Sequence, residues 1–109
     1  MSFTGVKEEF YYNGKLKSTW FECNGIREGD YKEFHGNGNL HTVCNYINGK
    51  LDGEKIRYYR NGNIMKRETY VNDLLDGMVQ RYNRNGTLMY SFTYKNGIQH
   101  GPFLEWYTN

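Results

Sequence analysis

The sequence predicts an all-β protein, an elongated single-layer antiparallel meander built from 24-residue β-hairpin repeats. One reason is a set of turn residues that recurs every 24 positions along the whole chain. The other reason is composition, because eleven tyrosines, six phenylalanines and 13 glycines stand beside one proline and no alanine. Such a composition favours short strands joined by tight turns. It excludes a helical bundle, whose helices are normally rich in alanine and leucine.

Three series of turn residues divide the chain into repeats. Asn-Gly stands at 13–14, 37–38, 61–62 and 85–86; a second series begins at Asn24, Asn48, Asn72 and Asn96; and the third is Gly5, Gly29, Gly53, Gly77 and Gly101. The single domain, residues 1–109, therefore consists of units at about 5–28, 29–52, 53–76 and 77–100 and a partial unit at 101–109. Each unit is expected to pack mainly against its neighbours.

Each unit contains two predicted strands. The first strand follows the single glycine, as in residues 54–59, and the second follows Asn-Gly, as in residues 40–47. A tight turn such as 61–62 alternates with a longer turn such as 48–53, since asparagine and glycine tolerate the positive φ that these turns need. With strands about 4.8 Å apart, about nine strands give a sheet about 43 Å long.

The register of the tight turn follows from two apolar columns. The aromatic column is Phe10, Phe34, Tyr58, Tyr82 and Trp106, and the aliphatic column is Leu16, Leu40, Ile64 and Leu88. A two-residue turn would place Leu40 opposite His35, whereas a three-residue loop with glycine in a bulge pairs the two columns. We therefore expect the three-residue loop and a buried ladder, which Tyr46, Tyr70 and Tyr94 extend. The preceding column, Glu9, Glu33, Arg57, Arg81 and Glu105, is expected on the solvated face.

The repeat resembles a known family. The residues that carry the likeness are Tyr58-Tyr59-x-Asn61-Gly62-x-Ile64, then Tyr70-x-Asn72, then Asp76-Gly77. They are similar to the MORN repeat, most closely to the variant MORN repeats of bacterial proteins described as antitoxins and of proteins from large DNA viruses. The resemblance covers residues 5–109, and the Asn72-Asp73 pair departs mildly from Asn-Gly. It implies a twisted single-layer sheet with aromatic side chains stacked along a groove, and a role as a scaffold or interaction module.

The residue types that catalysis needs are present but unconnected. No motif links the serines to His35, His41 or His100, and His100 occupies a column of polar turn residues. Cys23 and Cys44 form no CxxC pair, and their strands lie too far apart for a disulfide. We therefore expect a non-enzymatic protein without metal or cofactor. The absence of a signal-peptide pattern and the two free thiols favour a cytoplasmic location.

Surplus aromatic side chains suggest an interface. Tyr11, Tyr31, Tyr59, Phe103 and Tyr107 are expected on the face opposite the ladder. A single-layer sheet cannot bury both faces alone, so exposed rings there could bind a partner or a second copy in a homodimer. The alternative is that tyrosine simply suits strands and pairs across them.

A basic cluster is the second candidate site. Arg57 and Arg81 share one column, Arg60 and Arg84 share another, and Lys66 and Arg67 follow nearby. The cluster could contact an acidic protein or, weakly, anionic phospholipid headgroups. The alternative is a solvated surface paired with Glu54 and Glu68. Nucleic acid is disfavoured, because a net charge of +2 releases few counterions.

These observations favour a non-catalytic scaffold that mediates protein–protein interaction, with the identity of the partner open. Two alternatives remain at this stage. One is antitoxin-like neutralisation of a partner toxin, which only the family resemblance suggests. The other is peripheral association with an anionic membrane through the arginine cluster.

Overall fold

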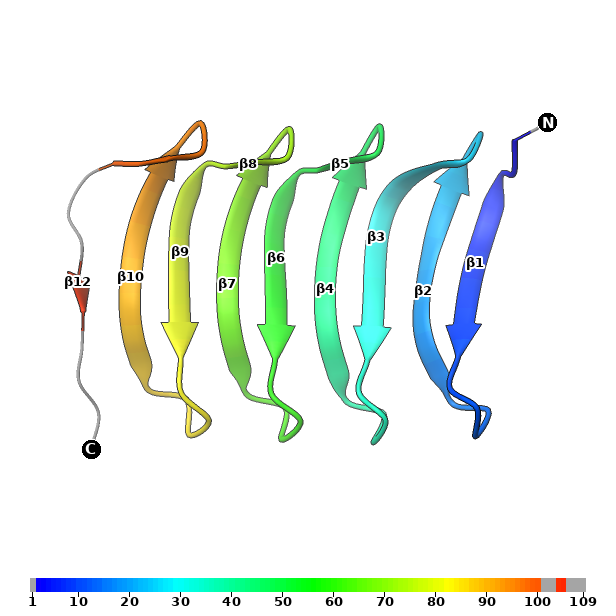
Figure 1. Ribbon diagram of the computed structural model, residues 1–109, viewed down its shortest axis with the longest axis horizontal. Helices are drawn as coiled ribbons and strands as arrows, with labels where there is room; N and C mark the ends of the chain where they lie inside the picture. The colour runs from blue at the N-terminus through cyan, green and yellow to red at the C-terminus, as the bar shows by residue number, and fades with distance from the viewer. Residues whose placement is uncertain (1, 101–103, 106–109) are drawn as a thin grey trace.

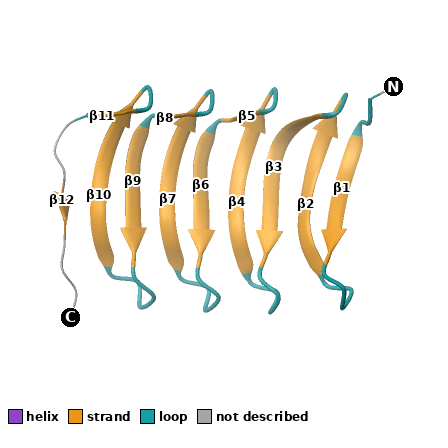
Figure 2. Cartoon of the chain, viewed as in Figure 1, coloured by secondary structure: helices purple, strands orange, loops and turns teal. Residues whose placement is uncertain are grey.

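The computed structural model describes residues 2–100, 104 and 105, and the chain there forms a 12-stranded antiparallel sheet (Figures 1 and 2). The strands are β1 (Gly5–Phe10), β2 (Leu16–Cys23), β3 (Ile26–Phe34), β4 (Leu40–Ile47), β5 (Lys50–Leu51), β6 (Gly53–Tyr58), β7 (Ile64–Val71), β8 (Leu74–Leu75), β9 (Gly77–Tyr82), β10 (Leu88–Lys95), β11 (Ile98–Gln99) and β12 (Leu104–Glu105). Among these residues, the structure offers no helix of the length and apolarity that a membrane crossing requires.

The long strands follow one another in chain order, and the molecule measures 48 × 34 × 13 Å. The two-residue strands β5, β8 and β11 pair with the ends of β4, β7 and β10 and run crosswise along the upper rim in Figures 1 and 2. A thickness of 13 Å leaves room for one sheet with side chains on both faces. The predicted elongated, single-layer meander is therefore confirmed.

The tight turns at the lower rim are the predicted three-residue loops. In the second hairpin, the His35 N–H donates to the Asn39 carbonyl at 2.7 Å, and the Gly38 N–H donates to the His35 carbonyl at 2.9 Å. Gly38 has a φ of 92°, the left-handed region that glycine adopts without steric cost. The same pair of backbone bonds closes the other three tight turns, at Tyr11, Tyr59 and Asn83.

The predicted pairing of the two apolar columns is confirmed in all four described hairpins. Phe10 pairs with Leu16, Phe34 with Leu40, Tyr58 with Ile64, and Tyr82 with Leu88. Trp106, the last member of the aromatic column, lies outside the described residues. The ladder is half-buried rather than buried as expected, and Phe10 is 57% exposed. One layer of strands has nothing above this ladder to cover it.

The expected extension of the ladder by Tyr46, Tyr70 and Tyr94 is wrong. After each ladder pair the register shifts by one residue; thus Tyr58 pairs with Ile64, but Arg57 pairs with Lys66. The extra residue forms a β-bulge, which reverses the alternation of side chains along the rest of the strand. Gly53 then faces Tyr70 on the side opposite Tyr58. The three tyrosines therefore lie on the other face of the sheet.

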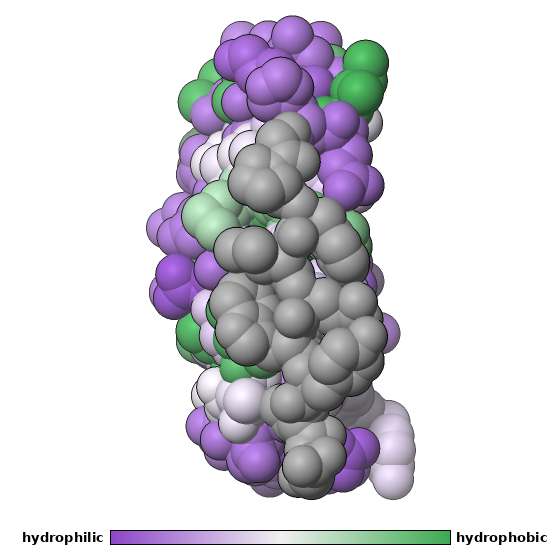
Figure 3. Space-filling view, turned by 90° about the vertical axis from the view of Figure 1, so that its left-hand side faces the viewer, coloured by the Kyte–Doolittle hydropathy of each residue, from purple (hydrophilic) through white to green (hydrophobic). Residues whose placement is uncertain are grey.

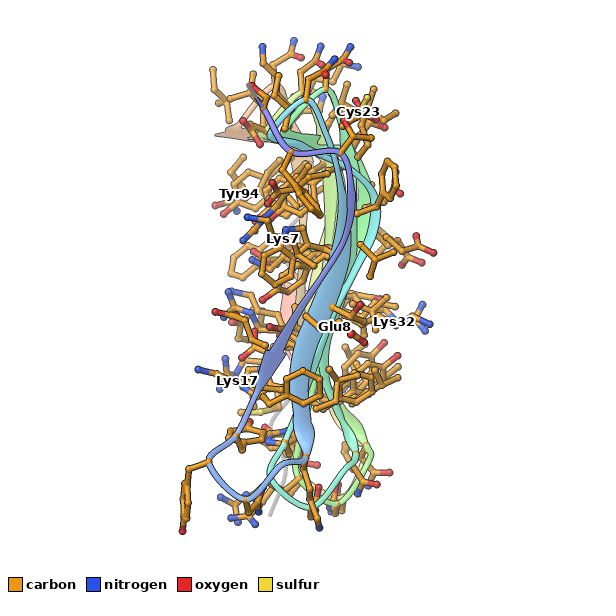
Figure 4. The ribbon with its side chains drawn as sticks, turned by 90° about the vertical axis from the view of Figure 1, so that its right-hand side faces the viewer. Lys7, Glu8, Lys17, Cys23, Lys32 and Tyr94 are labelled. Carbon is orange, nitrogen blue, oxygen red and sulfur yellow. The ribbon has the colours of Figure 1, made fainter. Side chains whose placement is uncertain are left out.

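The sheet has a concave and a convex face (Figure 4). Lys7, Lys17 and Tyr94 point to the hollow side of the bowed strands, whereas Glu8, Lys32 and Cys23 point to the outer side. Since cross-strand partners point to the same face of a sheet, these labelled residues show to which face the other strand residues belong. The apolar ladder belongs to the convex face. The column that contains Glu9, Glu33, Arg57 and Arg81 belongs to the concave face.

The concave face carries most of the buried side chains of the described chain, so the prediction that this face is the solvated one is wrong. Among the described residues the buried side chains are Ser18, Thr42, Cys44, Glu68, Val79 and Ser91, and all but Ser91 lie on the concave face. The charged column lies directly beside them, with Glu33 and Arg81 half-buried and Glu9 and Arg57 exposed. Each face of this thin sheet thus mixes apolar and charged side chains. In the edge-on view of Figure 3, hydrophilic residues gather at the two turn rims.

Side-chain hydrogen bonds join successive hairpins along both rims. At the lower rim, the side-chain amides of Asn37 and Asn39 both donate to the Arg60 carbonyl, and the amides of Asn61 and Asn63 repeat this contact with the next turn, at Arg84. At the upper rim, the Gly49 N–H donates to the Arg27 carbonyl at 3.0 Å. These contacts stack the hairpins and fix the position of the face between the rims.

Candidate functional site

Cations gather in one row at the centre of the concave face. Arg57 on β6 pairs with Lys66 on β7, which pairs in turn with Arg81 on β9. We call these three residues the basic row. Toward β1 the same row continues with acidic and hydroxyl side chains instead of cations; for example, Glu33 on β3 pairs with Thr42 on β4. The row therefore changes sign along the sheet, from acidic at β1 and β3 to basic at β6, β7 and β9.

Four of the five predicted arginines have no carboxylate partner among the described side chains. Within residues 2–100, no ion pair involves Arg57, Arg60, Arg81 or Arg84. Lys66 does have one, because its Nζ lies 3.8 Å from Glu68. Arg67 is separate from the cluster, since it lies on the convex face and pairs with Glu54 at 3.5 Å. The structure thus brings Arg57 and Arg81 together around Lys66 and excludes Arg67.

Arg60 and Arg84 line a hollow of about 350 Å³ at the lower rim. The other lining residues of this rim hollow are His35, Tyr59, Asn61 and Met65. The Arg84 guanidinium lies over the Tyr59 ring, 5.9 Å from its centroid. The four predicted arginines therefore form two groups on the same side of the sheet, one in the basic row and one at the rim.

Tyr11, Tyr31 and Tyr59, the described members of the predicted interface aromatics, lie on the concave face, and Tyr11 and Tyr59 link neighbouring hairpins. The Tyr11 hydroxyl donates to the Phe34 carbonyl at 2.6 Å, and the Tyr59 hydroxyl donates to the Tyr82 carbonyl at 2.8 Å. Tyr11, Tyr31 and Tyr59 are half-buried, not exposed as the sequence suggested. Phe103 and Tyr107 lie outside the described residues. A role of these rings in binding stays a prediction.

A second hollow, of about 240 Å³, lies between the rims on the concave face, and we call it the mid-strand hollow. Its lining comprises Arg27, Tyr31, Glu33, His41, Thr42, Cys44, Tyr46, Lys55 and Arg57. Thr42 and Cys44 are only 5% and 3% exposed and form its floor. Burial raises the pKa of the Cys44 thiol, while the charges of Lys55 and Arg27 act in the opposite direction. The cations therefore lie close enough to the floor to affect its electrostatics.

Arg27 is held among aromatic rings. Its guanidinium lies 4.8 Å from the Trp20 ring centroid, 4.9 Å from that of Tyr31 and 5.5 Å from that of Tyr46. An Arg27 N–H also donates to the Tyr46 hydroxyl at 3.3 Å. Cation–π contacts of this kind fix a guanidinium through its faces and leave N–H groups at its edge available.

The histidines and cysteines form no metal site or disulfide in the described part of the chain. The His35 and His41 rings are stacked at 4.5 Å between centroids, and His41 Nδ1 lies 4.0 Å from Glu33. Among residues 2–100, 104 and 105, no three His, Cys, Asp or Glu side chains gather as metal ligands. Cys23 and Cys44 are free and lie on opposite faces.

Sequence reasoning missed Arg27 and Lys55. A signal for Arg27 existed in the repeat, because its column otherwise contains Leu51, Leu75 and Gln99. A cation in a mostly aliphatic column indicates a local change of surface. The approach of Arg27 on β3 to Lys55 on β6, across β4, depends on the curvature of the sheet and has no sequence signal.

Comparison with known proteins identifies the repeat. The family model described as the MORN repeat variant matches four segments, at residues 3–21, 27–48, 51–72 and 75–96. Each segment begins near the start of a hairpin and ends near the following longer turn. No curated protein and no solved structure matches the chain.

Proposed function

Since the chain belongs to the MORN repeat family in its variant form, we propose that it is a non-catalytic scaffold that binds a protein partner across its concave face. Repeats of this family are generally associated with protein or membrane interaction. The observation that carries the proposal is the basic row, in which Arg57 and Arg81 have no ion pair within residues 2–100. An acidic segment of a partner would supply the missing carboxylates.

The shape of the face favours a protein segment over a bilayer. The basic row lies in the hollow of the bowed strands, between two rims of turns. A flat membrane would touch the rims first and leave the row at a distance, where salt screens its charge within about 8 Å. An extended segment can enter the hollow and meet the guanidiniums directly.

The proposal is tested on a purified partner, after affinity capture with the native chain. The test variant is Arg57→Glu/Arg81→Glu, and the control is Lys15→Glu/Lys32→Glu, which makes the same change in net charge away from the concave face. We expect the test variant to weaken binding by at least about tenfold while the control keeps the native affinity. Binding should also weaken as salt rises.

Two outcomes would contradict the proposal. One is a folded Arg57→Glu/Arg81→Glu variant that keeps the native affinity. The other is binding of anionic vesicles, lost in this variant, with no protein partner captured, which would favour membrane association. If the captured protein arrests growth when expressed alone and is neutral when co-expressed with the chain, the binding is a toxin neutralisation.

A further inference from the structure

We propose that the mid-strand hollow is a receptor for one carboxylate group, contributed by an acidic residue or a chain end of the bound partner. The inference rests on the proposed function in one respect, namely that a protein segment lies along the concave face. The hollow shares Arg57 with the basic row but adds Arg27 and Lys55, which belong neither to the basic row nor to the rim hollow.

Charge is the first argument. The lining contains three strong cations, Arg27, Lys55 and Arg57, and one carboxylate, Glu33. Within residues 2–100, none of these cations has an ion pair. Glu68 faces Lys55 across the strands, but it is bonded to the Tyr70 hydroxyl at 3.1 Å and paired with Lys66. The hollow therefore has an excess of positive charge that Glu33 only partly offsets.

Preorganisation is the second argument. Three aromatic rings surround the Arg27 guanidinium, and its one hydrogen bond within the described part of the chain goes to the Tyr46 hydroxyl. The remaining N–H groups at its edge are available to a ligand, and little side-chain entropy is lost on binding. Lys55 extends from the adjacent hairpin, and Thr42 adds a hydroxyl at the floor.

Size limits the hollow to one small group, and Glu33 lowers the positive charge that this group meets. A volume of about 240 Å³ suits one side chain, since pockets for drug-sized ligands begin at about 300 Å³. Glu33 is held by the Tyr31 hydroxyl at 3.3 Å and lies within the lining. Its charge offsets one of the three cations, so an anion that enters the hollow meets a formal excess of two positive charges rather than three.

The test measures binding of short blocked peptides to the full chain by NMR titration. One peptide carries an internal glutamate and an amidated C-terminus, the second carries glutamine and a free C-terminal carboxylate, and the third carries glutamine and an amidated C-terminus. A fourth carries phosphoserine in place of glutamate. We expect one of the first two to bind with shifts confined to the hollow, which identifies the source of the carboxylate, and the third not to bind.

Variants locate the contact. Lys55→Met should lower the affinity for the binding peptide by about tenfold, as expected for loss of a charge-assisted hydrogen bond. Lys32→Gln, on the convex face, is the control and should leave the affinity unchanged. Glu33→Gln should tighten the binding of the phosphoserine peptide more than that of the carboxylate peptide.

Three results would overturn the inference. They are binding of neither carboxylate peptide, equal affinity in Lys55→Met, or tighter binding of the phosphoserine peptide than of either carboxylate to the native chain. These results are distinguishable from failure of the proposed function. A partner that requires Arg57 and Arg81 but is indifferent to Lys55→Met refutes the receptor alone, whereas a partner indifferent to Arg57 and Arg81 refutes the proposed function.

Discussion

At the scale of single residues, the longer turns show why one repeat has aspartate where the others have glycine. A Cβ on Gly49 would lie 2.9 Å from Ile26 Cγ2, and one on Gly97 would lie 3.4 Å from Leu74 Cδ2. The residue that corresponds to Ile26 and Leu74 for Asp73, 23 positions before it, is Lys50. Asp73 adopts a φ of 70° and accepts the Leu51 N–H at 2.7 Å. A branched apolar neighbour thus accompanies Gly49 and Gly97, Ser2 is the neighbour of Gly25, and a lysine accompanies Asp73.

This relation predicts a paired effect at the second longer turn. Gly49→Asp should destabilise the protein by about 1–3 kcal/mol, through the strained backbone and the contact with Ile26. Adding Ile26→Lys should recover part of this loss, because the double variant has the same lysine and aspartate pair as Lys50 and Asp73. Denaturant melts of the single and double variants measure both effects.

Gly14→Asp is the matched control for the contact with Ile26. Gly14 has a φ of 89°, but nothing lies within 4 Å of a Cβ built on it. Its substitution should cost only the backbone strain, and Ile26→Lys should not reduce that cost. Equal losses at Gly14 and Gly49 would show that the packing of Ile26 over the turn is unimportant.

A second residue-scale prediction concerns alkaline pH. Burial, followed by the charge and hydrogen bond of Glu68, raises the pKa of Tyr70 from 10.0 to about 12. Between these values the unfolded chain releases the phenolic proton while the folded chain retains it. The stability that Tyr70 contributes is therefore complete below pH 10 and falls as the pH rises from 10 to about 12. Tyr70→Phe should reduce this alkaline loss.

The measurement is a series of denaturant melts across that pH range. Tyr12→Phe, which removes a fully exposed hydroxyl, serves as the reference variant. Tyr31 contributes in the same direction, since burial and then Glu33 raise its pKa, so part of the slope should remain in Tyr70→Phe. Identical slopes for Tyr70→Phe and Tyr12→Phe would contradict the role of Tyr70.

At the scale of elements, the hairpins are joined by recurring side-chain bonds at the tight turns. The Tyr59 hydroxyl donates to the carbonyl of Tyr82, the last residue of β9. Tyr11, two repeat units earlier, makes the same contact with Phe34, the last residue of β3. In the hairpin between them, His35 Nε2 takes this role by donating to the Tyr58 carbonyl at 2.9 Å. One column thus uses two residue types for a single function, the spacing of successive hairpins.

Removing one such hydroxyl should lower the free energy of unfolding by a measurable amount. Tyr59→Phe leaves the ring in place and deletes the donor to Tyr82, which should cost about 1 kcal/mol in the free energy of unfolding. Tyr12→Phe makes the same chemical change at a side chain that is fully exposed, and it should be neutral. A melt that finds the two variants equally stable would show that this bond does not hold the hairpins together.

The same elements show how far the sequence could predict the structure. The turn residues predicted the meander and the three-residue loops, and the apolar columns predicted the pairing of Tyr58 with Ile64. The face of Tyr70 could not be predicted, because the bulge that follows the pairing has no residue signature. The bulged positions are Lys17, His41, Met65 and Met89.

The candidate site was predictable to a similar degree. A shared column placed Arg57 and Arg81 in one row, and the sequence spacing placed them in adjacent hairpins. Arg67 was wrongly grouped with them, although neighbouring residues of a strand point to opposite faces. The mid-strand hollow depends on the bowing of the strands, which brings Arg27 toward Lys55 and which no single column encodes.

At the scale of the whole molecule, the fold is an array without a common core. In the described part of the chain each hairpin pairs with the hairpins beside it, and the long dimension of 48 Å runs across the strands. The outer edge of β1 has no neighbouring strand within the described residues. In such an array, stability depends on the coupling between neighbouring units and is lowest at an end with one neighbour.

Hydrogen exchange should reveal this gradient. We expect amides of β1 to exchange faster than those of β4 and β6, since β1 opens without disturbing the central hairpins. Tyr11→Phe should accelerate exchange mainly in the first hairpin, whereas Tyr59→Phe should accelerate it throughout the centre. Uniform protection from β1 to β7 would indicate a single cooperative unit instead.

The arrangement of strands across the long axis also determines how the protein responds to force. Tension applied between β1 and β10 would load the inter-strand hydrogen bonds one ladder at a time, because β1 forms one edge of the sheet and β10 lies near the other, beside β12 (Figure 1). A stretched unit of 24 residues is about 80 Å long, against about 10 Å when folded. The chain would therefore lengthen in equal steps of about 70 Å at low force, each step releasing one hairpin while the others stay folded. A partner seated across several hairpins would resist this peeling and would set the length of sheet that remains intact under load.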